Sequence, residues 1–492
     1  MDAARPDSYR ILREADLRDY LAQLPLIAEV LGGPSGDWSI SEVGDGNLNL
    51  VFIVKGGKGG LAVKQALPYV RLVGESWPLP LSRSHYEYLA LTRQAQLAPG
   101  LVPAVLHRDE ALALVAMELL EPHVIMRKGL IAGTLYPRFV DDITTFMART
   151  LFFSSDLAVP AAEKKEGIAE FAGNHALCKI TEDLIFTDPY REAEQNRWTS
   201  PWLDATAAGF REDLDAHVAI SRLKLKFLSS PEALIHGDLH TGSIMVTESD
   251  TRVIDPEFAC YGPMGFDIGA VLANLLMSYF ASAGHERSPD GRHAFEAWIL
   301  QTVEDVWTEF ARKFLELWRG EARGDAYPAS LFEGTVGAAR LEVERQAYMA
   351  RLFADTAGFA AAKIIRRILG LAHNIDFEWI EDTNAEPRAR RKVCALPGNA
   401  GGRRVLPSDR CGDQDGARAA RLATGFLAGL LFRVFFTRTG THPASSAAHA
   451  SLENALGRCF FLGNGHFAPR INPNLCHQRK HDCDDRSKHC RG

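Results

Sequence analysis

Two short apolar runs that each end in acidic residues constrain this chain more than any other feature. The first run leads into His236, Gly237 and Asp238, and a later one ends at Asp255 and Glu257. Phosphoryl transfer needs this layout, because one carboxylate must orient and deprotonate the attacking hydroxyl while others hold the magnesium that neutralises a triphosphate. Such catalysis is mostly positioning and electrostatics, so the strand ends that fix these acids matter as much as their identity. The pattern predicts a small-molecule kinase.

The composition is compatible with an enzyme of two or three domains. The chain has 492 residues, 46% of them apolar, which is enough for a large core. No run reaches the roughly 18 apolar residues of a membrane helix, and the N-terminus has no apolar signal region. Residues 1–382 hold only Cys178 and Cys260, as is normal in a reducing compartment. We therefore expect a cytoplasmic protein with no membrane contact.

The order of hydrophobic patterns predicts two lobes. A helix is expected at 8–33, a second at 83–96, and strands at 38–43, 48–54, 61–65 and 111–119. After about residue 121 the pattern is mostly helical, notably at 266–280, 293–314 and 353–371. A β-rich lobe at 1–120 followed by a larger, mostly α lobe at 121–382 is typical of the bilobal, α+β, protein-kinase-like fold, with the acids near the junction.

Residues suited to a nucleotide lie in the first lobe. Glycines around Asn47 would let backbone N–H groups approach phosphate oxygens, although such a turn is also typical of an ordinary β-hairpin. Lys64 lies inside an apolar strand and needs a counter-charge, for which phosphate and Glu87 are candidates; alternatively, it snorkels from an edge strand. The segment Glu118–Leu120 ends a strand where a hinge could pair with adenine, and it reads equally well as a plain core strand.

The second lobe supplies the reacting groups. Asp238 is the candidate general base, and Asp255 and Glu257 are hard oxygen ligands suited to Mg²⁺. Their alternation predicts that both lie on one side of an extended segment. His236 and His240 are expected to orient or pack rather than to bind zinc, because a spacing of four in a loop does not favour a zinc pair. Asp267 is expected to cap a helix and brace the loop of Asp238.

These segments resemble one family closely, the 5-methylthioribose kinases of methionine salvage, within the aminoglycoside phosphotransferase-like superfamily. The resemblance spans about residues 8–382 and includes the glycine-rich turn, Glu75-Ser-Trp-Pro-Leu79, the loop of Asp238, Asp255-Pro256-Glu257 and the Arg366-Arg367 pair. Ser243, where related kinases usually have asparagine, combined with Asp-Pro-Glu makes the match fairly specific.

The resemblance implies ATP-dependent transfer to the 1-hydroxyl of 5-methylthioribose, with Asp238 as general base. It assigns the remaining roles as follows: Asn47 and Lys64 to ATP phosphates, Glu118, Leu119 and Leu120 to the adenine side, Asp255, Pro256 and Glu257 to nucleotide and Mg²⁺, and Arg366 and Arg367 to the substrate. Neighbours on a helix point about 100° apart, so one arginine of the pair could instead face the surface. The family also implies a homodimer.

Two other readings of the kinase-like residues stay open. The acceptor could be another small sugar or amino alcohol, since the acids specify the reaction and not the acceptor. The chain could also be an inactive nucleotide-binding protein, although the presence of Lys64, Asp238, Asp255 and Glu257 disfavours this.

The segment after residue 382 has a different composition. From Thr383 onward there are 18 Lys and Arg against 8 Asp and Glu, with six of the eight cysteines and almost no helical or strand period. We expect a disordered or non-native extension. A zinc module around Cys476, His481, Cys483 and Cys490 fits no ordinary finger spacing, and a nucleic-acid-binding arm would be expected to interleave aromatic residues.

Overall fold

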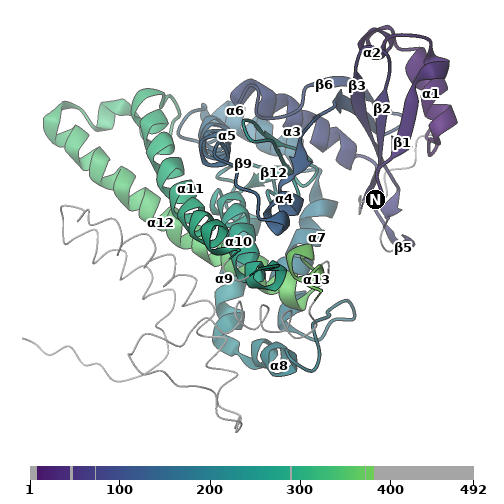
Figure 1. Cartoon of the computed structure of the whole chain (residues 1–492). Coiled ribbons are helices and arrows are strands. Elements are labelled where there is room, and N and C mark those ends of the chain that lie inside the picture. The colour runs from purple at the N-terminus through teal and green to yellow at the C-terminus, as the bar shows by residue number, and fades with distance from the viewer. Residues whose placement is uncertain (1–7, 45–47, 72–73, 289–290, 372, 382–492) are drawn as a thin grey trace, which may run out of the picture.

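The computed structural model describes residues 8–44, 48–71, 74–288, 291–371 and 373–381 (Figure 1). The N-terminal part contains a five-stranded antiparallel sheet in the order β1-β2-β3-β7-β6. The strands are β1 (Ser39–Glu42), β2 (Asn49–Lys55), β3 (Gly60–Ala66), β6 (Val105–Asp109) and β7 (Leu114–Glu118), with the hairpin β4 (Tyr69–Val70) and β5 (Gly74–Pro78) beside them.

One face of this sheet packs against helices, and the other carries the candidate nucleotide-binding lysine. Side chains alternate along a strand, so buried Leu61 and Val63 of β3 pack with α1 (Glu14–Ala22) and α2 (Pro25–Leu31), and Lys64 points to the opposite face. On that face lies α3 (Arg83–Leu97), which carries Glu87. The single helix expected at 8–33 is wrong, because Pro25 has no N–H to continue a helix and begins a new one.

The C-terminal part is mostly helical, as predicted (Figure 1). Its long helices are α5 (Phe139–Phe153), α9 (Leu214–Ser229), α10 (Gly265–Ser282), α11 (His293–Gly320) and α12 (Gly334–Leu369). Shorter ones are α4 (Met126–Ala132), α6 (Ala161–Phe171), α7 (His175–Phe186), α8 (Asp204–Glu212) and α13 (Ile375–Glu378). Short strands connect them: β8 (Val124–Ile125), β9 (Ala233–Ile235), β10 (Ile244–Val246), β11 (Thr251–Val253) and β12 (Cys260–Gly262).

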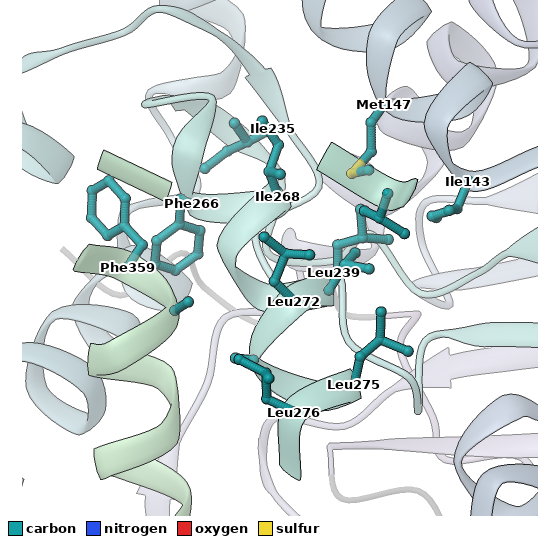
Figure 2. Packing of buried hydrophobic residues seen from close by; sticks show 14 of the residues in the cluster. Ile143, Met147, Ile235, Leu239, Phe266, Ile268, Leu272, Leu275, Leu276 and Phe359 are labelled. Carbon is teal, nitrogen blue, oxygen red and sulfur yellow. The ribbon is translucent and has the colours of Figure 1, made fainter. Parts of the chain in front are cut away.

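Helix α10 forms the centre of the larger core. The rings of Phe266 and Phe359 meet at 5.5 Å between α10 and α12, and Figure 2 shows Leu239 surrounded by core side chains of α5 and α10. A Cβ at Gly269 would lie 2.7 Å from the carbonyl oxygen of Thr356, so glycine permits the close approach of α10 to α12. Since Leu239 follows Asp238, the core fixes the position of the candidate catalytic loop.

The helix α10 also bears on the expectation about membranes. Its continuation to His285 gives a 21-residue segment containing a window with a mean hydropathy of 1.4, long and apolar enough by length and composition to cross a membrane, although polar residues such as Asp267 and Asn274 interrupt its apolar run. However, 83% of it is buried inside the fold, where a central core helix meets the same criteria.

The fold class is confirmed: the chain is α+β, with a β-sheet lobe followed by a helical lobe. The expected helix at 353–371 is the end of α12, which begins at Gly334 and pairs with α11 in a long projecting hairpin (Figure 1). The strands β4, β5 and β6 were not predicted. The domain boundaries stay predictions, and the tail at 383–492 lies outside the described residues.

Candidate active site

Lys64 is the centre of a buried charge cluster. Its Nζ donates to Glu87 Oε1 at 2.9 Å, forms an ion pair with Asp255, and lies 4.0 Å from Glu257 Oε2. Glu87 and Glu257 keep only 3% and 5% side-chain exposure, whereas Asp255 keeps 44%. Lys64 therefore has the counter-charges that its position in an apolar strand requires, and it does not snorkel to the surface.

Asp255 and Glu257 come together as predicted, but for a different reason. Asp255 has a φ of 69°, in the left-handed region, so the segment is not extended and alternation does not bring its acids to one side. Glu257 is held in place by Asn49 Nδ2, which donates to its Oε2 at 2.8 Å, and by Arg83 Nε at 3.6 Å. The amide of Asn49, at the start of β2, thus positions an acid.

The three carboxylates are suited to bind a cation. Ligand atoms of Glu87, Asp255 and Glu257 all lie within 4.8 Å of one another. Burial raises the pKa of Glu87 to about 7, an effect that Lys64 partly offsets, and burial likewise raises the pKa of Glu257. For Lys64, burial would lower the pKa, but the acids Asp255, Glu257 and Glu87 raise it above its ordinary value. The ammonium stays charged, and the cluster carries more negative than positive charge.

The loop of Asp238 depends on Gly237. This residue has a φ of 84°, and a Cβ there would lie 2.2 Å from the carbonyl oxygen of Phe258, so a side chain cannot fit. Both carboxylate oxygens of Asp267 accept backbone N–H groups of the loop, from His236 at 2.6 Å and Gly237 at 3.0 Å. The predicted bracing role of Asp267 is confirmed, whereas its predicted capping role is wrong, because α10 begins at Gly265 with Met264 at the N-cap and Asp267 lies inside the first turn.

The two histidines of the loop bind protein groups. His236 Nε2 lies 2.9 Å from the carbonyl oxygen of Ile254, and the N–H of Asp238 donates to its Nδ1 at 3.3 Å. His240 Nδ1 accepts the N–H of Gly242 at 3.0 Å. Ser243 Oγ donates to the carbonyl oxygen of Asp238 at 3.0 Å and so closes the loop. Both histidines orient the loop, as predicted.

Asp238 faces a set of cations. Its Oδ1 lies 3.3 Å from Lys363 Nζ, its Oδ2 lies 3.4 Å from His240 Nε2, and its side chain keeps 31% exposure. Burial would raise the pKa of Asp238, but its interaction with His240 and the positive charges of Lys363, Arg367 and Arg366 together lower it well below its usual range. Burial also lowers the pKa of His240 well below its ordinary value, so this ring is neutral near pH 7. The lasting cations are Lys363, whose pKa burial lowers but whose ion pair with Asp238 favours the charged ammonium, and Arg366 and Arg367, since a guanidinium stays protonated.

Both arginines of the pair lie close enough to act on Asp238. Arg367 is buried at 8% exposure, and Arg366 is half-buried with an Nε that is enclosed and finds no hydrogen-bond partner in the described part of the chain. The alternative that one of them is a surface residue is therefore wrong. Behind them, Arg127 binds the loop through Thr241 Oγ1 at 3.2 Å and lies 3.6 Å from Asp376 Oδ2.

The other predicted nucleotide residues are less closely tied to the acids. Glu118 ends β7 and makes two hydrogen bonds with Ala104. Its N–H donates to the Ala104 carbonyl oxygen at 2.8 Å, and its side-chain carboxylate accepts the Ala104 N–H at 3.1 Å. Leu119 and Leu120 follow it in the connection to the second lobe, and Pro256 separates the two acids. Asn47 lies outside the described residues.

Comparison with known proteins agrees with this geometry. Residues 39–310 match the model of the phosphotransferase enzyme family. Methylthioribose kinase 1 of Oryza sativa subsp. japonica is 46% identical over 388 residues, which cover 78% of this chain and 90% of that protein. The chain belongs to the methylthioribose kinase family. Another relative, the methylthioribose kinase of Escherichia coli O45:K1, is 44% identical over 392 residues, covering 80% of this chain and 93% of the relative.

A more distant likeness is found among solved structures. The choline kinase from Cryptosporidium parvum Iowa II has a TM-score of 0.41 and 12% sequence identity, covering 77% of this chain and 95% of that one.

Sequence reasoning missed one group that touches Asp238. Lys363 precedes Arg366 and Arg367 by three and four positions, the spacing that places residues on one helix face, so the arginine pair could have indicated it. Arg83, which is 1% exposed and lies beside Glu257, had no comparable signal because its partner is 174 positions away.

Proposed function

We propose that this methylthioribose kinase family member transfers the γ-phosphoryl group of ATP to the 1-hydroxyl of 5-methylthioribose, giving the 1-phosphate in methionine salvage. The observation that carries the proposal is the placement of Asp238, whose partly exposed carboxylate faces three lasting cations. Those cations suit a site through which an anionic phosphoryl group passes. The relatives' name supplies the acceptor.

In the proposed reaction, Asp238 orients the acceptor hydroxyl and takes its proton. A carboxylate with a lowered pKa is a weak base, yet phosphoryl transfer passes through a loose transition state in which positioning counts for more than basicity. Arg366 and Arg367 would bind acceptor oxygens and the charge that develops on the transferred group, for which a guanidinium fork offers several donors.

On the nucleotide side, we propose that Lys64 and Asn47 bind phosphate oxygens and that Asp255 and Glu257 bind Mg²⁺. The donor set fits this ion, because Mg²⁺ prefers carboxylate oxygens and shares its coordination with substrate phosphates. When bound, the ion would neutralise the phosphates of ATP. Glu87 would hold Lys64 in place, and Pro256 would space the two ligands. Glu118, Leu119 and Leu120 would border the adenine.

The decisive experiment measures ADP release by the full chain with ATP, Mg²⁺ and a panel of acceptors. We expect a clear preference for 5-methylthioribose over ribose and choline, and a 1-phosphate product identified by ³¹P NMR. Preference for another sugar or amino alcohol would replace the acceptor and keep the reaction. Nucleotide binding without turnover of any acceptor would instead support an inactive nucleotide-binding protein.

We also propose lobes at 1–120 and 121–382 and a tail that is dispensable for catalysis. This division predicts that a chain ending at residue 382 retains the full kcat. A cytoplasmic enzyme that binds neither membranes nor nucleic acid is consistent with the few cysteines of residues 1–382 and the net charge of −7.

The proposed homodimer has a candidate surface on α9. Four of its apolar side chains are exposed on one helical stripe: Leu214 (73%), Val218 (50%), Leu225 (63%) and Leu228 (55%). The opposite face, with Ile220 and Phe227, is buried, so the helix is apolar on both sides. The stripe is nearly symmetric about Ser221, so a two-fold axis there would pair Leu214 with Leu228 and Val218 with Leu225 of the second copy.

Light scattering on the full chain tests this surface. We expect a dimer that Leu225→Asp converts to a monomer and that the matched variant Leu331→Asp leaves unchanged, because Leu331 is 71% exposed and lies outside the stripe. A monomeric wild-type protein would overturn the homodimer. A dimer that resists Leu225→Asp would retain the homodimer and exclude α9 as its interface.

A further inference from the structure

Lys363 is a buried cation to which the proposed chemistry assigns no role beyond its positive charge. It lies in α12, keeps 6% side-chain exposure, and its Nζ is 4.1 Å from the centroid of the Phe266 ring. Its Nζ also donates to Asp238 Oδ1 at 3.3 Å. Burying an ammonium is costly unless it is paired, and Asp238 is the carboxylate to which it is paired here.

The carboxylate of Asp238 is held at both of its oxygens. Lys363 engages Oδ1, and His240 Nε2 lies 3.4 Å from Oδ2. Each carboxylate oxygen has two lone pairs, so both contacts leave acceptor sites for a hydroxyl group. Because Phe266 and Phe359 pack in the core between α10 and α12, the helix that carries Lys363 is a rigid support (Figure 2).

We propose that Lys363 is a positioning residue for phosphoryl transfer: its ammonium, hydrogen-bonded to Oδ1, fixes the rotamer of Asp238. The inference rests on the proposed role of Asp238 as the group that receives the acceptor hydroxyl. The core helix α12, together with His240 of the loop, thereby sets the direction of the base. A displacement of about 1 Å in such a group can lower a rate about 100-fold.

The positive charge of Lys363 is distinct in its role from the arginines that follow it. Arg366 and Arg367 lie one turn further along α12, and their charge lowers the pKa of Asp238, while Lys363 donates a hydrogen bond to Asp238 Oδ1. Loss of Lys363 should therefore change kcat with little change in the KM for ATP, while loss of an arginine should change the KM for the acceptor.

The first test compares kcat and its pH profile in Lys363→Met and wild type. We expect kcat to fall roughly 10- to 100-fold and the acidic limb of the profile to move to higher pH, because the pKa of Asp238 rises when a neighbouring cation is removed. The other groups that act electrostatically on this carboxylate, His240, Arg127, Arg366 and Arg367, remain, as does Asp267 near position 363. Lys363→Arg should restore part of kcat and return the limb toward its wild-type position.

A matched control separates the loss of a buried lysine from the loss of this one. Lys164 is 2% exposed, forms an ion pair with Asp156, and lies outside the described contacts of Asp238. Lys164→Met should lower thermal stability without moving the acidic limb. If Lys363→Met behaves like this control, with an unchanged limb and kcat, the proposal is wrong. If Lys363→Met fails to fold, Lys363→Gln takes its place in each comparison, because glutamine keeps a hydrogen-bond donor and lacks the charge.

A second test does not depend on turnover, so it can fail separately from the proposed function. Unfolding free energies of Lys363→Met, Asp238→Asn and the double variant form a cycle that isolates the coupling between the two side chains. We expect the double variant to be less destabilised than the sum of the single variants. Additive effects would show that the pair is not coupled and would overturn the proposal, even in an enzyme that phosphorylates 5-methylthioribose.

Discussion

The two sides of the active site carry opposite charge. On the nucleotide side, the carboxylates of Glu87, Asp255 and Glu257 outnumber the nearby cations Lys64 and Arg83. On the acceptor side, one carboxylate, Asp238, faces Lys363, Arg366 and Arg367. The first side lacks positive charge that a metal ion would supply, and the second has positive charge to spare for an arriving phosphoryl group.

The two sides also differ in how the chain builds them. The nucleotide side joins a strand, a helix and a loop whose acids follow short strands. The acceptor side takes its cations from one helix, α12, at positions 363, 366 and 367. Separate elements can adjust to a nucleotide that changes during turnover, whereas a single core helix holds the acceptor's charges at fixed distances. The predictions below change one side and measure whether the other responds.

The largest effect is expected on the acceptor side. Asp238→Asn removes the proposed proton acceptor but keeps the shape of the side chain, so kcat should fall about 10²- to 10⁴-fold. The dissociation constant of ADP, measured by calorimetry, should stay within about twofold of wild type. Asp141→Asn, at an ion pair with Lys313 outside the site, is the control and should keep full activity. Unchanged turnover in Asp238→Asn would show that another group receives the proton.

A change on the nucleotide side should alter the metal requirement. Loss of even a group that only orients a metal ligand costs about 10- to 100-fold in metal affinity, so Asp255→Asn should raise the Mg²⁺ concentration for half-maximal activity about 100-fold. Chelation with EDTA should abolish turnover of the wild type. The control is Asp250→Asn, five positions before Asp255. It removes a carboxylate that pairs with His123 and Arg252, and it should leave the Mg²⁺ requirement unchanged. An unaltered requirement in Asp255→Asn would remove this residue from the metal site.

The nucleotide side was more predictable from sequence than the acceptor side. Lys64 stands out as a charge in an apolar strand, and Glu87 is the acid that a kinase-like lobe supplies, so their contact at 2.9 Å followed from local patterns. Asp255 and Glu257 were also identified. The left-handed backbone conformation of Asp255 was not identified, because the residues that usually signal this conformation, glycine and asparagine, do not occupy the position.

The acceptor side depends on contacts that local patterns do not encode. Lys363 and Asp238 are 125 positions apart, and a lysine on a helix usually reads as a solvated residue. Only the packing of α10 against α12 brings them together, and that packing depends on close backbone contact at Gly265 and Gly269. The fold class was predictable because it follows from the order of elements, whereas this distance follows from tertiary packing.

The arginine pair distinguishes binding of the acceptor from binding of the nucleotide. A charged hydrogen bond contributes about 1.5–3 kcal/mol, so Arg366→Met and Arg367→Met should each raise the KM for 5-methylthioribose about 10-fold or more. The KM for ATP should change little. Arg351→Met on the same helix removes a pair with Glu344 and is the matched control. If both variants raised the KM for ATP instead, the arginines would belong to the nucleotide side, and the division of charge between the two sides would be wrong.

The smallest expected effect is a change in the pH dependence of stability on the nucleotide side. The pKa of Glu87 is raised by burial to about 7, so the folded state binds this proton more tightly than the unfolded chain does. Its contribution to stability is therefore full below about pH 4.5 and is lost as the pH rises through 7. Glu87→Gln removes this titration, so the unfolding free energy should vary less with pH between pH 5 and 8, while Glu257 retains its own part of the dependence.

The same measurement on Asp238→Asn gives the opposite sign. The pKa of Asp238 is lowered, so its ionised form stabilises the fold above the unfolded pKa and this contribution is lost as the pH falls. Glu87→Gln should thus flatten the curve on its alkaline side and Asp238→Asn on its acidic side. If both variants changed the pH dependence of the unfolding free energy in the same direction, the two carboxylates would lie in similar electrostatic surroundings. The contrast between an acid-rich and a cation-rich side would then be wrong.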